Sequence, residues 1–126
     1  MKKGKLITAV VLMAIVALCG SLAADTLQRF QSALVFLQKA RMTSAVQAKN
    51  ENLKSAKENL LQANYDRGGN RAAALAHTMQ AIARVNEFNL EKANREIDMA
   101  IVKVKHSILT LKQETQAKKK SASVRK

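Results

Sequence analysis

Two histidines are the residues in this sequence with the clearest potential for metal chemistry, and they stand far apart. A metal site on one helix needs ligands three or four residues apart, because that spacing puts both side chains on one face. Those places hold no ligand around either histidine: Ala73, Ala74, Gln80 and Ala81 surround His77, and Val102, Lys103, Leu109 and Thr110 surround His106. We therefore expect both histidines to face water. Weak copper or zinc binding through His77 and His106 would need ligands from different helices.

No group of residues is typical of an active site. The only cysteine is Cys19, and Gly68-Gly69 lacks the Lys-Ser/Thr sequel of a phosphate-binding loop. The acidic residues of 91–98 alternate with basic ones, and Glu91 stands four residues before Arg95, which favours a surface of ion pairs. We therefore expect a non-catalytic protein without a resident cofactor.

The charge of the chain is strongly positive, with 22 basic and 9 acidic residues. Five basic residues gather at the C-terminal end, among Ser, Ala and Val: Lys118, Lys119, Lys120, Arg125 and Lys126. This composition predicts a disordered basic tail over 118–126. Each cation near an anionic surface contributes about 1 kcal/mol, so the tail could bind an anionic envelope surface or polymer. The aromatic residues do not alternate with basic ones, and we expect no specific nucleic-acid partner.

The N-terminus has the pattern of an export signal. Lys2, Lys3 and Lys5 precede an apolar run over 6–18, which is shorter than the roughly 20 residues of a membrane span. Ser21-Leu22-Ala23 then fits a small-x-small cleavage site. We expect residues 1–23 to be a signal peptide and the mature protein to be periplasmic. An uncleaved anchor is the alternative.

Residues 24–117 have the periodicity of packed helices, and the chain contains no proline. Apolar residues recur at spacings of three and four in four segments: Leu27, Phe30, Leu34 and Leu37; Leu53, Ala56, Leu60 and Ala63; Ala72, Leu75, Met79 and Ile82; and Ile97, Ile101, Val104, Ile108 and Leu111. Stripes of this kind predict an all-α domain in which each helix buries one face.

The strongest break between helices is Asp66-Arg67-Gly68-Gly69-Asn70, where a glycine can end one helix and Asn70 can cap the next. Weaker breaks are expected near 42–45, with Ser44 opening a capping box, and near 86–89, with Asn89 as a cap. The prediction is an up-down four-helix bundle made of two helical hairpins. One hairpin of two long helices is the alternative. A shift of 48 residues, which aligns Ala33 with Ala81, suggests an internal repeat.

Four short segments resemble the small periplasmic metal-binding protein family: Ala56-Lys57-Glu58-Asn59-Leu60, Gly68-Gly69-Asn70, Ala81-Ile82 and Ala100-Ile101. The similarity extends over residues 26–112. It implies two helical hairpins joined by the Gly-Gly-Asn link, and divalent metal binding, copper included, through histidines along the helices. This chain departs from the family because it has only His77 and His106.

The export signal gives a direct prediction. If the signal is cleaved after Ala23, N-terminal sequencing of protein taken from the cell envelope should start at Ala24 or Asp25. A mature chain that starts at Met1, or at a lipidated Cys19, contradicts the prediction.

Overall fold

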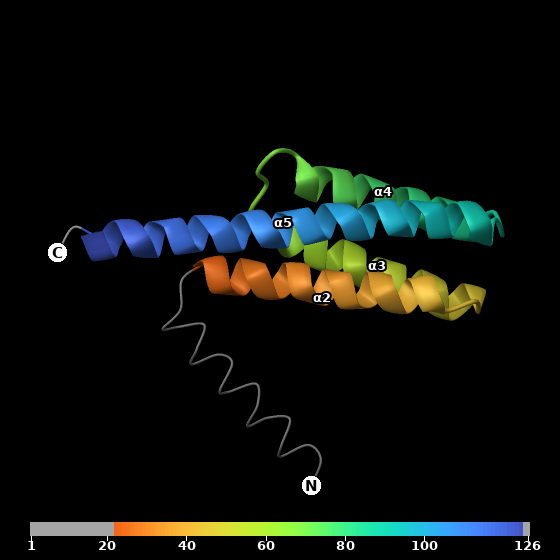
Figure 1. Ribbon diagram of the computed structural model, residues 1–126. Helices are drawn as coiled ribbons and strands as arrows, with labels where there is room; N and C mark the ends of the chain where they lie inside the picture. Colours follow the sequence, from red (N-terminus) through yellow and green to blue (C-terminus); the bar gives the residue numbers. More distant parts are fainter. Residues whose placement is uncertain (1–21, 125–126) are drawn as a thin grey trace, which may run out of the picture.

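Four helices follow one another in a computed structural model that describes residues 22–124 and the side chains of 24–120. They are α2 (Leu22–Met42), α3 (Val46–Gln62), α4 (Asn70–Asn86) and α5 (Leu90–Val124). The described residues form no strand, which confirms the all-α class (Figure 1). The predicted signal peptide lies outside the described residues except for the backbone of 22–23. Cys19, Arg125 and Lys126 also lie outside them.

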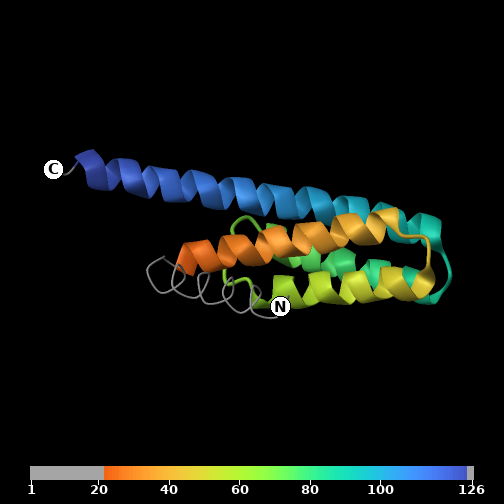
Figure 2. The same cartoon turned by 90° about the horizontal axis from the view of Figure 1, so that it is seen from below.

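The helices form a closed ring in which each packs against two neighbours. The neighbouring pairs are α2 with α3, α3 with α4, α4 with α5 and α5 with α2, while the backbones of the diagonal pairs do not approach closely within residues 22–124. The turns at 43–45 and 87–89 lie at the same end of the bundle, and the α3–α4 loop lies at the other (Figure 2). The up-down four-helix bundle is therefore confirmed, and the alternative of two long helices is wrong.

Small residues set the spacing of the helices. Half of the sixteen buried hydrophobic residues are alanine, and they alternate with larger side chains along each buried stripe. Leu53, Ala56, Leu60 and Ala63 are all buried, as predicted for α3. Because an alanine projects so little, the facing helix can approach closely and the neighbouring large side chains fill the space on either side.

The predicted stripe of α4 is wrong. Its core residues are Ala74, Thr78, Ala81 and Val85, whereas Ala72 is exposed and the Met79 side chain is 50% exposed. Leu75 and Ile82 flank the core and are partly buried. The prediction followed the larger apolar residues, whereas the small residues lie at the centre of the contact between the helices. In α5, Ile101 and Ile108 likewise flank a core that includes Ala93, Ala100 and Ser107.

The loop between the hairpins differs from the expectation at both ends. Helix α3 ends at Gln62, well before the glycines, and Asn70 is the first residue of α4 and does not cap it. Gly68 and Gly69 have φ angles of 67° and 72°, which side chains with a Cβ rarely adopt. The capping acceptor for α4 is Asp66, whose carboxylate accepts a hydrogen bond from the Ala72 N–H at 3.3 Å. The glycines therefore turn the chain into α4.

The two shorter turns confirm one predicted cap and contradict the other. The Asn89 side chain accepts a hydrogen bond from the Lys92 N–H at 3.2 Å, as a cap of α5 should. Helix α3 starts instead with Ala45 as N-cap and no side-chain cap, so the Ser44 capping box is wrong.

The predicted shift of 48 matches the buried residues consistently only in the first helix of each hairpin. A shift of 48 carries Phe30, Ala33 and Leu37 of α2 onto buried residues of α4. Helix α4 has 17 residues and α2 has 21, so the second helices correspond by a shift of 44, which aligns Ala56 with Ala100. The difference of four residues between α2 and α4, about one helical turn, is why a single shift does not fit the whole chain.

Phe88 occupies a backbone position that usually belongs to glycine. Its φ is 59°, the only positive φ at a non-glycine residue within the described part of the chain. Its N–H donates to the Val85 carbonyl at 2.9 Å, and the Asn89 N–H donates to the Arg84 carbonyl at 2.9 Å. This pair of bonds is the Schellman ending of a helix, with Phe88 at the left-handed position. The side chain gains little burial in return, since it is 77% exposed.

Replacing Phe88 by glycine should therefore stabilise the protein. The left-handed conformation costs a non-glycine residue about 1–2 kcal/mol, and the flexibility of glycine in the unfolded chain cancels roughly half of the gain. We expect the free energy of unfolding to rise by about 0.5–1 kcal/mol in a denaturant titration. Phe88→Ala is the control, because it removes the ring and keeps the Cβ. A loss of stability in Phe88→Gly would mean that the ring packs against the bundle more than its exposure indicates.

Candidate functional site

The C-terminal part of α5 projects beyond the rest of the bundle (Figures 1 and 2). The helix continues through Lys118, Lys119 and Lys120 to Val124, so the prediction of a disordered segment is wrong up to that residue. Alanine, lysine and glutamine are good helix formers, and extending an existing helix is much easier than starting a new one. The lysines are exposed and stand on a helical scaffold.

Lysines dominate α5 after Asp98. Six of them follow within the described residues, against the single carboxylate of Glu114: Lys103, Lys105, Lys112, Lys118, Lys119 and Lys120. Lys105, Lys112 and Lys119 stand seven residues apart and are all exposed, so they form a row along one side of the helix with about 10.5 Å between neighbours. This row and Lys118 and Lys120 make up the lysine face of α5.

Apart from the contact between His77 and Glu96, arginines and not these lysines hold the ion pairs of the described residues. The pairs are Arg41 with Asp98 at 2.9 Å, Arg67 with Glu114 at 3.2 Å, Arg84 with Glu87 at 3.0 Å and Arg95 with Glu91 at 2.7 Å. The pair between Glu91 and Arg95 confirms the expected ion-pair surface at 91–98. The ammonium groups of the lysine face therefore have no carboxylate partner within the described chain and remain available to an external anion.

The one carboxylate in this part of α5 is engaged by the loop between the hairpins. The Glu114 carboxylate forms an ion pair with Arg67 and lies next to the hydroxyl of Tyr65. Burial, and then the Glu114 carboxylate, raise the pKa of Tyr65. The Tyr65 ring packs edge-on against Phe30 of α2, with 6.3 Å between the ring centroids. These contacts hold α5 to the bundle as far as Glu114. Lys118, Lys119 and Lys120 lie beyond them.

The histidines do not form a joint site. His77 is not free in solvent, as the sequence suggested, because its Nδ1 lies 2.7 Å from a carboxylate oxygen of Glu96 on α5, and each side chain is only 24% exposed. His106 is exposed, as predicted. It lies ten residues beyond Glu96, about 15 Å further along the helix. Nowhere in residues 22–124 do three or more histidine, cysteine or acidic side chains gather in a way that could hold a metal ion.

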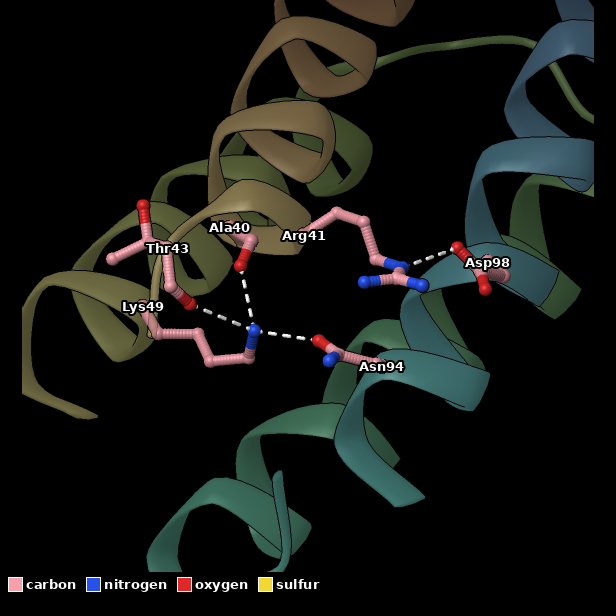
Figure 3. A network of polar contacts seen from close by, with 6 residues as sticks. All are labelled: Ala40, Arg41, Thr43, Lys49, Asn94 and Asp98. Atoms are coloured by element: carbon pink, nitrogen blue, oxygen red, sulfur yellow. Dashed lines mark hydrogen bonds and ion pairs between the residues drawn. The ribbon is translucent and has the colours of Figure 1, made fainter. Parts of the chain in front are cut away.

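A buried lysine joins three helices at the end of the bundle that carries the short turns. Lys49 is 1% exposed, and its Nζ donates to the carbonyls of Ala40 at 2.7 Å and Thr43 at 3.0 Å. The third donor goes to Oδ1 of Asn94 on α5, at 2.6 Å (Figure 3). All three N–H groups of the ammonium are therefore satisfied. The Arg41–Asp98 pair joins α2 to α5 beside them (Figure 3).

Burial, and then the nearby charge of Arg41, lower the pKa of Lys49. Lys49 was not among the residues predicted to be functional, although the apolar spacing of α3 points to it. Continuing the stripe of Leu53, Ala56 and Leu60 back by four residues reaches Lys49, a charged residue in a core position. Such a residue needs partners for all its donors, and these come from the preceding turn and from α5.

Comparison with family models, with curated proteins and with solved structures finds no match to this chain. The resemblance to the small periplasmic metal-binding protein family therefore stays a prediction. Among the helices described here, none combines the length and the apolar character that crossing a bilayer requires.

Replacing Lys49 by methionine should destabilise the bundle by about 1–3 kcal/mol at neutral pH, because the Thr43 carbonyl and the Asn94 amide lose a buried donor. In the double variant with Asn94→Leu, the cost should be smaller than the sum of the single costs. Lys54→Met is the control, because Lys54 is exposed on the same helix. Denaturant titrations of the four variants measure these differences.

The lowered pKa of Lys49 adds a pH dependence. Between that pKa and the ordinary lysine value of 10.5, the unfolded chain binds more protons than the folded one, so stability rises with pH. The difference in unfolding free energy between the wild type and Lys49→Met should widen in this range. The raised pKa of Tyr65 contributes equally to the pH dependence of both proteins, so it does not change this difference. A difference that stays constant with pH would show that burial does not oppose the charge of Lys49.

Proposed function

We propose that this chain is an exported, non-catalytic binding protein that attaches to anionic components of the cell envelope through the lysine face of α5. The observation that carries the proposal is the projecting basic end of α5, where Lys118, Lys119 and Lys120 are exposed on a helix. Phosphate-bearing lipids and polymers are the anions that match it by charge.

The distribution of ion pairs within the protein supports the proposal. Five carboxylates of the described residues pair with arginines or with His77, none pairs with a lysine of the lysine face, and α5 beyond Asp98 keeps six lysines against Glu114. Desolvation costs little for ammonium groups at this exposure, and the attraction adds over several of them. Binding of this kind weakens with salt, because counterions screen the charges and are released when the anion binds.

The test is a binding assay with vesicles that contain phosphatidylglycerol, over a series of salt concentrations, measured by co-sedimentation. In the triple variant Lys118→Gln, Lys119→Gln and Lys120→Gln, three contributions of about 1 kcal/mol each are lost, so we expect affinity to fall on the order of 100-fold. The salt dependence should become shallower as well, because fewer counterions are released.

The matched control removes the same charge elsewhere: Lys54→Gln, Lys57→Gln and Lys92→Gln, on α3 and at the start of α5. Equal losses in the two triple variants would show that net charge alone governs binding. No vesicle binding, together with copper or zinc binding that is lost in the double variant His77→Ala, His106→Ala, would overturn the proposal in favour of metal binding. Calorimetric titration with each metal ion measures that outcome.

A further inference from the structure

The side of α5 that faces away from the bundle carries a second regular stripe. Its residues recur at spacings of three and four, and we call them the outer stripe: Met99, Val102, His106, Leu109, Gln113 and Gln116. The core stripe of the same helix runs through Ile97, Ala100 and Val104, on the opposite side. The outer stripe is therefore centred on the solvent side of α5.

Three of the first four residues of this stripe are large and apolar, and His106 lies among them. Met99, Val102 and Leu109 are 50%, 51% and 56% exposed, although each is large. The lysine row of Lys105, Lys112 and Lys119 runs along one side of the stripe, about 60–100° around the helix from its centre. An exposed apolar stripe bordered by lysines is the pattern of a helix that lies in the interface of a bilayer, with its lysine stems along the apolar surface and their ammonium groups at the headgroups.

From this arrangement we infer that the outer stripe of α5 lies on an anionic lipid bilayer, with Val102 and Leu109 in contact with the acyl chains. The inference rests on the proposed function and narrows its ligand from anions in general to a lipid surface. A soluble polyanion would engage the lysines and give no reason for the apolar residues between them. The inserted residues and the lysine row act together, since both lie on the exposed half of one helix.

Charge argues against a second copy of the chain as the occupant. Two copies brought together along this side of α5 would each present the five lysines of the lysine face, and like charges would repel across the contact. The polar residues Gln113 and Gln116 would also interrupt an apolar seam between two helices. An anionic bilayer reverses the sign of this interaction, because its headgroups attract the lysines that a second copy would repel.

A single tryptophan can test the contact, because the sequence contains none. Leu109→Trp places the fluorophore on the outer stripe. Leu61→Trp is the control, because Leu61 is 46% exposed on α3, the helix diagonally opposite α5. With phosphatidylglycerol vesicles, the emission of the Leu109→Trp variant should shift to shorter wavelength, and brominated acyl chains should quench it. The emission of the Leu61→Trp variant should show neither change.

Charge variants test whether the lysine row and the outer stripe bind the bilayer together. Adding Lys105→Gln and Lys112→Gln to Leu109→Trp should weaken binding on the order of 30-fold, while Lys54→Gln and Lys57→Gln should have a much smaller effect. Co-sedimentation of the Leu109→Trp variant without quenching would overturn the inference and leave the proposed function standing, as would binding to polyphosphate alone. Equal quenching in the two tryptophan variants would overturn it as well. Absence of any anion binding would overturn both.

Discussion

The ammonium group of Lys49 lies where three helices meet, and almost no water reaches it. Its three N–H groups must therefore be satisfied by the protein, and each partner comes from a different part of the chain: the last turn of α2, the turn that follows it, and Asn94 of α5. Removing any partner leaves a buried donor unpaired, which is costly. The arrangement fixes the direction in which α3 leaves α2 and holds the α5 helix against both. The α2–α3 hairpin therefore depends on the second hairpin for a complete set of hydrogen bonds.

The same device recurs at the other end of the bundle. The guanidinium of Arg71, at the start of α4, donates to the carbonyls of Leu60 and Leu61 in the last turn of α3, at 2.8 and 3.1 Å. In both cases a cation from the following helix satisfies the carbonyls that end the preceding one, where the helix dipole also favours positive charge. Of the three helices that are followed by another within residues 22–124, only α4 ends in a Schellman turn, and there Phe88 takes the left-handed position. At two of the three connections between helices, a cationic side chain therefore donates hydrogen bonds to carbonyls at the end of the preceding helix. These bonds link each of those helices to the next.

Much of this architecture was accessible from the amino-acid sequence, because the spacing of apolar residues directly reports which face of a helix is buried. The number of helices, the two short turns and the core of α3 follow from that spacing and from Asn89. The α4 core was missed because hydrophobicity weights Met79 above Ala74, whereas close packing prefers the smaller residue. The pairing of His77 with Glu96 was missed because the two lie on different helices, and periodicity says nothing about which helices adjoin. For the site, sequence located the cluster of Lys118, Lys119 and Lys120 and misjudged its conformation, because composition alone does not show that an established helix leads into it.

Charge is unevenly distributed along α5. Residues 90–98 hold three carboxylates and two cations, while six lysines and one carboxylate follow Asp98 within the described residues. The helix has 35 residues and is about 52 Å long, so this separation gives the molecule an electric dipole along its long axis in addition to its net charge. A charged body exerts a torque on such a dipole before any contact forms, and the torque acts over the range that salt leaves unscreened. The molecule therefore turns as it diffuses towards a negative body, so that the projecting end of α5 leads and the turns at 43–45 and 87–89 trail.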